Sequence, residues 1–399
     1  MLRLKDTRHQ NTASFLASAI RIAEYYGFTP LDAAASAPAP VSKEKRRMPS
    51  AAECEAQIAF ARRDERALVA SARRCVSRAR GNDALFLWRI SSGPTRERSN
   101  APSTALELHV VGTNEAIAEA LLIVVADAIA AEAGIKERIL SINSIGSPDS
   151  SNRFVRDVGT YLRKHIDSIS PTLRPRIAAD PLGALVQLIE RGHPATPRAP
   201  QSMEYLTEEE RRKFWDLLEY LEVFGLPYEL SPHVLGSRDC WAHSLFEIST
   251  TDEETGVRIM LASGGRYDPL AARFASTPAA TISIVCEIHG RTRVKREPIP
   301  SPSLYFAHLG PEARRRALGV LELLRRAEIP VHQGLSFERI GEQMAAARRF
   351  NVPYILIMGH KEAMEGTVLV REVATNSQDA ILLPDLVPYL RKHSVATVA

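Results

Sequence analysis

The sequence from Leu235 to Leu270 reads LGSRDCWAHSLFEISTTDEETGVRIMLASGGRYDPL. Two short apolar runs, residues 244–249 and 257–262, flank the polar stretch TTDEETG, and this pattern predicts a β-hairpin with a loop of several residues. The second run leads directly into SGGRYD, residues 263–268. Two glycines after a strand allow the backbone to come close to a ligand or to another chain, and the arginine and aspartate place a cation and an anion beside them. We therefore interpret the hairpin and its glycine turn as the centre of a candidate site.

The order of FEI, a hairpin and GGRYDPL resembles the signature of histidyl-tRNA synthetases, the class II aminoacyl-tRNA synthetases that activate histidine with ATP. In that family the hairpin and the glycine turn line the aminoacyl-adenylate pocket. The resemblance implies a substrate and nucleotide pocket that contains Arg96, Arg238, Glu247, Gly264, Gly265, Arg266, Tyr267 and Asp268. It extends from about Thr12 to His393. It implies an α/β fold with an α+β core, in which a class II antiparallel sheet with helices precedes a C-terminal αβ domain of the anticodon-binding kind.

The resemblance also implies two domains. Residues 1–296 correspond to the catalytic core, and residues 303–399 correspond to the anticodon-binding-like domain. Within the core, residues 33–51 are rich in alanine, proline and lysine, which is typical of a flexible linker. The helix predicted at residues 12–26 resembles a dimer-interface element of the family, so we expect a homodimer.

Composition is that of an ordinary soluble globular protein. The 399 residues are 45% hydrophobic and 25% charged, and the net charge of +4 is compatible with an RNA partner without requiring one. The four cysteines form no C-x-x-C pair, so neither a zinc site nor a redox pair is indicated, and no metal site is predicted. The start of the chain has no apolar secretory segment, and the longest apolar run is interrupted by acidic residues. We expect a cytoplasmic protein with no membrane association.

Two strands separated by a long loop, residues 84–90 and 105–112, resemble the second class II motif. Counting back without gaps places Arg96 on the arginine that binds the α-phosphate in the family. In the family, the second of these two strands leads into a segment with a glutamine and a glutamate that hold the substrate imidazole and amine. Val110 and Asn114 stand at those two positions. Valine forms no side-chain hydrogen bond, and asparagine carries no charge to meet an ammonium group.

Two further positions lack a cation that the family uses. Counting back from the FEI run, Gly236 stands where the family has an arginine that promotes histidine activation, and Arg238 lies two residues later. On a strand, that spacing would place the Arg238 side chain on the same face. Near the third class II motif Glu287 is kept, but Ile288 replaces the arginine that contacts ATP. Arg96, Arg238 and Glu287 are therefore the remaining candidates for catalytic residues.

The C-terminal part alternates strand and helix patterns, which predicts a mostly parallel sheet covered on both faces. It resembles the anticodon-binding domain shared by histidyl-, prolyl- and threonyl-tRNA synthetases, through the runs GEQMAAA, IMGHKE and GTVLVRE. On this resemblance the candidate tRNA-binding residues are Gln343, Glu362 and Arg371.

Three hypotheses follow. The first is a histidyl-tRNA synthetase paralogue, a pseudoenzyme with weakened or lost histidine activation that keeps a tRNA-binding or regulatory role. The second is a divergent but active histidine–tRNA ligase, and only this hypothesis calls for ATP and Mg²⁺. The third is the regulatory subunit of ATP phosphoribosyltransferase, which resembles the same core. The replaced ligands argue against the second hypothesis, and the anticodon-type domain argues against the third. No cofactor is predicted for the first.

Overall fold

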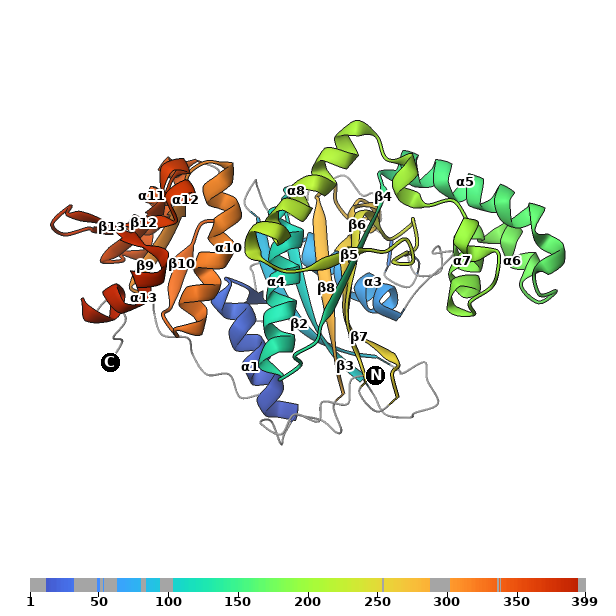
Figure 1. Cartoon of the computed structure of the whole chain (residues 1–399), viewed down its shortest axis with the longest axis horizontal. Helices are drawn as coiled ribbons and strands as arrows, with labels where there is room; N and C mark the ends of the chain where they lie inside the picture. The colour runs from blue at the N-terminus through green and yellow to red at the C-terminus, as the bar shows by residue number, and fades with distance from the viewer. Residues whose placement is uncertain are drawn as a thin grey trace. The chain divides into compact units, whose positions relative to one another are not determined.

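An eight-stranded sheet forms the centre of the first part of the chain (Figure 1). Its order is β1 (Thr29–Pro30), β2 (Leu85–Gly93), β3 (Ser103–Val111), β8 (Ala279–Glu287), β7 (Arg258–Arg266), β6 (Ala242–Thr251), β4 (Ile139–Gly146) and β5 (Tyr228–Leu230). The pairings from β2 through to β4 are antiparallel, and β5 joins β4 in parallel. The predicted class II antiparallel sheet is confirmed.

The computed structural model describes residues 12–31, 49–50, 53, 63–79, 84–93, 103–252, 255–287, 302–335, 337 and 339–393. It divides into two compact units. The first comprises Met1–Thr12, Pro30–Leu217 and Pro227–Thr292, and the second comprises Ala13–Thr29, Leu218–Leu226 and Arg293–Ala399. Of the linker predicted at residues 33–51, only residues 49 and 50 belong to the described part of the chain.

The predicted hairpin is confirmed, since β6 and β7 pair antiparallel along their length. The strand does not end before the glycines, however. β7 continues through Gly264 and Gly265 to Arg266, and Gly264 lies opposite Ile282 of β8. A Cβ atom on Gly264 would clash with the Thr281 carbonyl oxygen and lie 2.7 Å from the Phe246 ring. The close approach that these glycines permit is therefore to neighbouring strands.

Two helices pack on opposite faces of this sheet. Consecutive residues at the end of β7 show the arrangement, because Arg266 reaches Glu119 of α4 (Ile117–Glu132) whereas Tyr267 reaches His109, which lies beneath α3 (Arg63–Val76). α4 is apolar on nearly all sides and almost wholly buried, as expected of a helix inside a core. α3 is amphipathic and buries Leu68, Val69 and Cys75.

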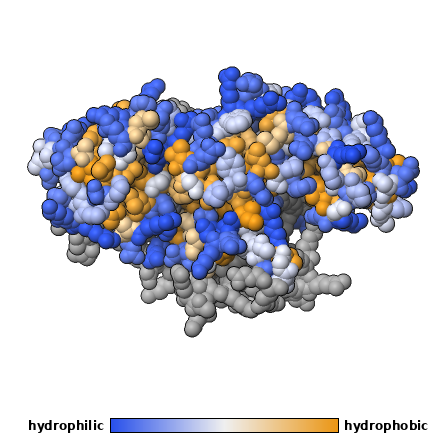
Figure 2. Space-filling view, viewed as in Figure 1, coloured by the Kyte–Doolittle hydropathy of each residue, from blue (hydrophilic) through white to orange (hydrophobic). Residues whose placement is uncertain are grey.

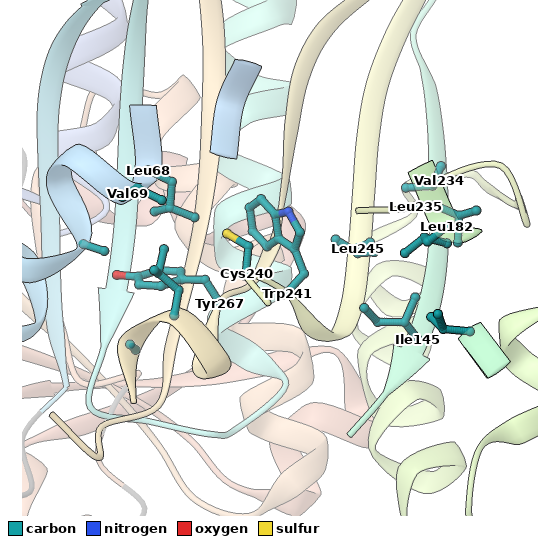
Figure 3. Packing of buried hydrophobic residues seen from close by; sticks show 14 of the residues in the cluster. Leu68, Val69, Ile145, Leu182, Val234, Leu235, Cys240, Trp241, Leu245 and Tyr267 are labelled. Atoms are coloured by element: carbon teal, nitrogen blue, oxygen red, sulfur yellow. The ribbon is translucent and has the colours of Figure 1, made fainter. Parts of the chain in front are cut away.

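A helical layer follows β4 in the chain. It contains α5 (Pro148–Lys164), α6 (Arg174–Ala179), α7 (Pro181–Glu190) and α8 (Glu208–Phe224). A capping box begins α8, because the Glu210 carboxylate accepts from the Thr207 N–H at 2.7 Å and the Thr207 hydroxyl accepts from the Glu210 N–H at 3.3 Å. Residues from this layer join the core that also contains α3. In Figure 3, Cys240 and Trp241 occupy the middle of that core, with Leu68 and Tyr267 on one side and Leu245 on the other.

The second unit contains a five-stranded sheet of order β10-β9-β11-β12-β13. Its strands are β9 (Leu304–His308), β10 (Val331–Gln333), β11 (Tyr354–Met358), β12 (Thr367–Glu372) and β13 (Gln378–Leu382), and its helices include α10 (Pro311–Arg326), α11 (Ile340–Phe350), α12 (His360–Glu365) and α13 (Leu383–Lys392). The predicted mostly parallel sheet is wrong in part: β10, β9 and β11 are parallel, but β12 and β13 are antiparallel additions. Parallel strands need a crossover of a dozen or more residues, and only residues 359–366 separate β11 from β12.

Helix α1 (Thr12–Tyr25) and the two residues after it pack within this second unit. The Tyr26 hydroxyl donates to Glu322 of α10 at 2.6 Å, and the Tyr25 hydroxyl donates to the Ile329 carbonyl at 2.8 Å. The Gln333 side chain donates to the Tyr26 carbonyl at 3.2 Å. The N-terminal helix is thus held by one buried and two partly buried hydrogen bonds to the C-terminal part of the chain.

The viewed surface mixes hydrophobic and hydrophilic side chains (Figure 2). Among the described residues, no helix has the length and apolar character needed to cross a membrane.

Candidate functional site

A buried polar cluster lies between α3 and the sheet. Glu107 and His109 alternate with apolar residues along β3, so both point to the α3 face. Glu107 Oε2 lies 3.4 Å from His109 Nε2 and accepts from the Ser71 hydroxyl of α3 at 3.1 Å. The Tyr267 hydroxyl lies 3.4 Å from His109 Nδ1. Sheet and helix therefore enclose a carboxylate, an imidazole and a phenol in direct contact.

The environment makes both Glu107 and His109 charged near neutral pH. Burial alone lowers the pKa of His109, but Cys75 and Glu107 beside it raise that pKa to about 9. Burial raises the pKa of Glu107, but the hydrogen bond and charge of His109, together with the charge of Arg89, hold it below its ordinary value. The result is a buried ion pair, with Arg89 Nε 3.6 Å from the same carboxylate.

Next to this cluster, Trp241 and Glu65 fill the space beside the hairpin. Glu65, in the first turn of α3, is fully buried and accepts from the Trp241 indole N–H and from the Ser237 N–H, each at 2.7 Å. A Cβ atom on Gly236 would clash with the Trp241 ring and lie 3.2 Å from Glu65 Oε1. Position 236 therefore has no room for an arginine while Trp241 and Glu65 hold these places.

The cavity that Glu107 and Trp241 line with Ser263, Thr281 and Ser283 has a volume of about 10 Å³. That is close to the smallest space that holds one water molecule, and far below the several hundred Å³ of small-molecule pockets. This gap between α3 and the sheet cannot admit an amino acid without movement.

A larger cavity of about 500 Å³ opens on the α4 side. Its wall includes Arg266 and Asp268 of the glycine turn, Asn114 and Glu119 at the start of α4, and His243. Arg266 is 3% exposed and donates to Glu119 at 3.0 Å, to the Thr113 carbonyl at 2.5 Å and to Asp268 at 3.3 Å. The Arg266 guanidinium therefore forms structural contacts within the fold. Burial is the main reason that the pKa of Glu119 is raised.

The structure separates the residues that the sequence placed in one pocket. Arg266 and Asp268 line the large cavity, whereas Tyr267 and Glu247 lie on the α3 face; Glu247 stands opposite Ser263. Arg238 is exposed in a turn, not on a strand, and donates to Asn152 of α5 at 2.7 Å. Arg96 and Ile288 lie outside the described residues, as does the side chain of Glu287. Within the described residues, no group of three or more His, Cys, Asp and Glu side chains is arranged to hold a metal ion.

Val110 and His109 show why gap-free counting along the sequence is fragile. Val110 is fully buried on the face opposite Tyr267, whereas its neighbour His109 contacts Tyr267. A shift of one residue along a strand exchanges the two faces, so His109, like Glu107, lies on the face of the sheet that Tyr267 shares. Sequence reasoning missed His109 and Glu65. The alternation of charged and apolar residues in LELHVV was the signal available for His109.

The three tRNA-binding candidates have different surroundings. Gln343 is fully buried, with Oε1 accepting from the His308 N–H at 2.9 Å and Nε2 donating to the His308 carbonyl at 2.8 Å. Glu362 accepts from the Gly359 N–H at 2.9 Å and so caps α12. Arg371, on β12, donates to Asn376 at 2.7 Å in an exposed turn. Gln343 and Glu362 therefore shape the domain; Gln343 is closed to solvent, whereas Glu362 and Arg371 are both partly exposed.

Comparison with known proteins gives consistent matches to one group. The family model described as the anticodon binding domain matches residues 304–393. The histidine–tRNA ligase of Bacillus licheniformis is 27% identical over 293 residues, covering 72% of this chain and 69% of that protein. The histidine–tRNA ligase of Rhodospirillum rubrum is 29% identical over 292 residues, covering 71% and 69%. A crystal structure of apo histidyl-tRNA synthetase from S. aureus aligns over 98% of both chains, with a TM-score of 0.49 and 17% identity.

These matches include both parts of the chain. The antiparallel sheet with its FEI hairpin and GGRYD strand lies in the first part, and the anticodon binding domain spans the end. The chain is thus similar to histidyl-tRNA synthetases over about 70% of its length, and it joins a class II sheet to a C-terminal anticodon-binding domain.

Proposed function

We propose that this protein is a histidyl-tRNA synthetase paralogue that has lost efficient histidine activation and acts by binding tRNA. The observation that carries the proposal is the contact between Trp241 and Glu65. These side chains fill the space beside Gly236, the position at which the family has an arginine for activation. Formation of an adenylate develops negative charge that must be met by fixed cations.

The glycine turn supplies no replacement for that cation. Arg266 is buried and its donors are taken by Glu119, Asp268 and the Thr113 carbonyl. Arg238 points to Asn152 on the exposed side of a turn. Loss of one preorganised contact of this kind costs about 3 kcal/mol in the transition state, so several losses lower the rate by many orders of magnitude.

Histidine-dependent ATP–pyrophosphate exchange tests this half of the proposal. Purified full-length protein should give exchange no greater than a control without histidine, while a histidine–tRNA ligase assayed in parallel gives robust exchange. Histidine-dependent exchange by the purified protein would overturn the pseudoenzyme assignment and support the ligase instead.

One observation favours a second candidate, a divergent active ligase. Glu107, His109 and Tyr267 form a polar cluster buried on the face that carries the family's glycine-turn tyrosine. Among the residues that the structure describes, Glu107 Oε1 has no hydrogen-bond partner. Such a cluster could serve an altered substrate pocket if α3 moves away. ATP–pyrophosphate exchange measured with each of the other amino acids tests this candidate, because an active ligase gives exchange with one of them. The third alternative, the regulatory subunit of ATP phosphoribosyltransferase, is disfavoured by the anticodon-binding domain.

The tRNA-binding half of the proposal rests on the match of residues 304–393 to the anticodon binding domain. Phosphate contacts by arginines make such binding electrostatic, so affinity should fall steeply as salt rises. The full-length protein should bind bulk tRNA at low salt and lose much of that affinity at moderate salt. No binding at low salt would remove the hypothesis, and equal affinity for unrelated duplex RNA would reduce it to non-specific attraction.

We also propose a homodimer, because the family element that includes α1 pairs subunits and closed two-fold assemblies are the commonest oligomers. Light scattering at micromolar concentration should give twice the 44.1 kDa chain mass. A monomeric mass would reject the dimer and leave the other parts of the proposal standing.

A further inference from the structure

An aromatic side chain at the end of α11 is unusually exposed. Phe350 is 51% exposed, although large apolar residues of this domain are mostly buried. Its ring stacks on His332 of β10, with ring centroids 3.8 Å apart and planes 13° apart. Tyr305 of β9 is the third ring of the group, 6.3 Å from Phe350 at 28°. Helix and sheet thus hold a stack of rings at the surface of the second unit.

The stack is fixed by its surroundings. α11 ends at Phe350 because Asn351 takes a left-handed conformation, with φ of 52°, and donates its N–H back to the Arg348 carbonyl. Tyr305 is fully buried beneath the sheet surface, and His332 is partly buried. A ring that is already immobilised loses little conformational freedom when a ligand stacks on it.

Positive charge surrounds the stack. Arg348 and Arg349 immediately precede Phe350, and both are exposed. Burial raises the pKa of Tyr305 to about 12, and the charge of Arg349 acts against that shift, which places the guanidinium near the ring group. An aromatic platform flanked by arginines is the arrangement by which proteins bind unpaired bases and their phosphates.

We propose that Phe350, supported by His332, is a stacking platform for an unpaired base of the RNA that binds this domain, with Arg348 and Arg349 contacting the adjoining phosphates. This rests on the proposed tRNA-binding function and adds a specific surface to it. The surface differs from the residues suggested by family resemblance. Gln343 lies seven residues earlier on α11, about 10 Å along the helix axis, and its side chain is fully buried.

The test uses full-length protein with single-residue variants. Phe350→Ala removes the platform, Phe350→Trp keeps a stacking ring, and Met364→Ala removes an apolar side chain that is 66% exposed on α12 of the same unit. Each protein is titrated with labelled bulk tRNA, with a single-stranded oligonucleotide and with duplex RNA, at two salt concentrations. Thermal unfolding confirms that each variant is folded.

Phe350→Ala should weaken binding of tRNA and of single-stranded RNA by about tenfold, because stacking of one base contributes about 1–3 kcal/mol. Duplex binding and the salt dependence should be unchanged, since no charge is altered. Phe350→Trp and Met364→Ala should bind as the wild type does. Arg349→Gln should instead reduce the salt dependence of the binding affinity for every RNA tested, because it removes one positive charge.

Equal affinity of Phe350→Ala and the wild type for single-stranded RNA would overturn the stacking platform and leave tRNA binding intact. An equal loss of affinity of Phe350→Ala for single-stranded and for duplex RNA would also overturn the stacking platform. A wild-type protein that binds no RNA at low salt would remove both the proposed function and this inference, and would turn the exposed ring into a candidate protein contact.

Discussion

At the residue scale, Gly264 and Gly236 are glycines for different reasons. A side chain at Gly264 would collide with the backbone of β8, so the sheet itself excludes it. A side chain at Gly236 would collide with Trp241 and approach Glu65, which are movable side chains. Strand packing therefore requires a glycine at position 264, whereas the packing of two side chains beside the hairpin requires one at position 236.

Gly264→Ala should therefore destabilise the protein. Insertion of a methyl group against rigid backbone costs about 1–3 kcal/mol. The matched control is Gly319→Ala in α10, where a new Cβ meets nothing within 4 Å and alanine favours the helix by about 0.5–1 kcal/mol. Urea unfolding should show a lower free energy of unfolding for Gly264→Ala and a higher one for Gly319→Ala, each compared with the wild type. A Gly264→Ala variant as stable as the wild type would show that β7 and β8 can separate without cost.

The Glu107–His109 pair gives the stability of the protein a defined pH dependence. The folded pKa of His109, about 9, exceeds its ordinary value of 6.5, so its contribution is fully present below pH 6.5 and is lost as pH rises through 9. The folded pKa of Glu107 lies below its ordinary 4.5, so its contribution is present above pH 4.5 and is lost as pH falls. Stability from this pair is therefore greatest between pH 4.5 and 6.5.

Wild-type stability should decline by about 3 kcal/mol between pH 6.5 and 9, because one pKa unit is worth about 1.4 kcal/mol. In His109→Gln that decline should largely vanish, although the variant is less stable at pH 6. Denaturant unfolding across this pH range measures both. A parallel decline in wild type and variant would show that His109 is neutral in the folded protein.

The residue scale is also where the sequence was least informative. Motif counting assigned Val110, Arg238 and Arg266 to positions of one pocket. Val110 and Arg266 do share the α4 face of the sheet, but Arg238 lies in an exposed turn. Glu65 was invisible because its partners, Ser237 and Trp241, are more than 170 residues away in the chain.

At the element scale, the sequence was a good guide. The hairpin and the alternating strands and helices of the second unit follow from periodicity. Short elements such as α12, with six residues, and β13, with five, were not predicted. Chain periodicity also gives no strand direction, and this is why the antiparallel edge of the second sheet was not predicted.

Helix α1 offers a test of how elements are held together. Tyr26→Phe removes the hydroxyl that donates to the buried Glu322, and a hydrogen bond to a charged group contributes about 1.5–3 kcal/mol. The control is Tyr389→Phe, whose hydroxyl donates to Asp379 at an exposed site and should change stability by less than about 0.5 kcal/mol. Thermal or urea unfolding measures both variants. Equal effects would mean that α1 is not anchored through Tyr26.

At the scale of the whole molecule, family membership was predictable because motifs survive along most of the chain, but the state of the active site was not. No pattern in the sequence shows that α3 brings Glu65 into contact with Trp241, and a fold alone does not decide activity. The N-terminal helix likewise joins the C-terminal unit, although it is more than 270 residues distant in sequence.

On the proposed function, Trp241 and Glu65 fill the space beside Gly236, where the family has an arginine for activation, so the protein should not bind a histidyl-adenylate. Calorimetric titration of the full-length protein with a non-hydrolysable histidyl-adenylate analogue tests it independently of catalysis, with a histidine–tRNA ligase as the positive control. The protein should give no measurable heat of binding at concentrations that saturate the control. Stoichiometric binding at micromolar or tighter affinity would contradict it.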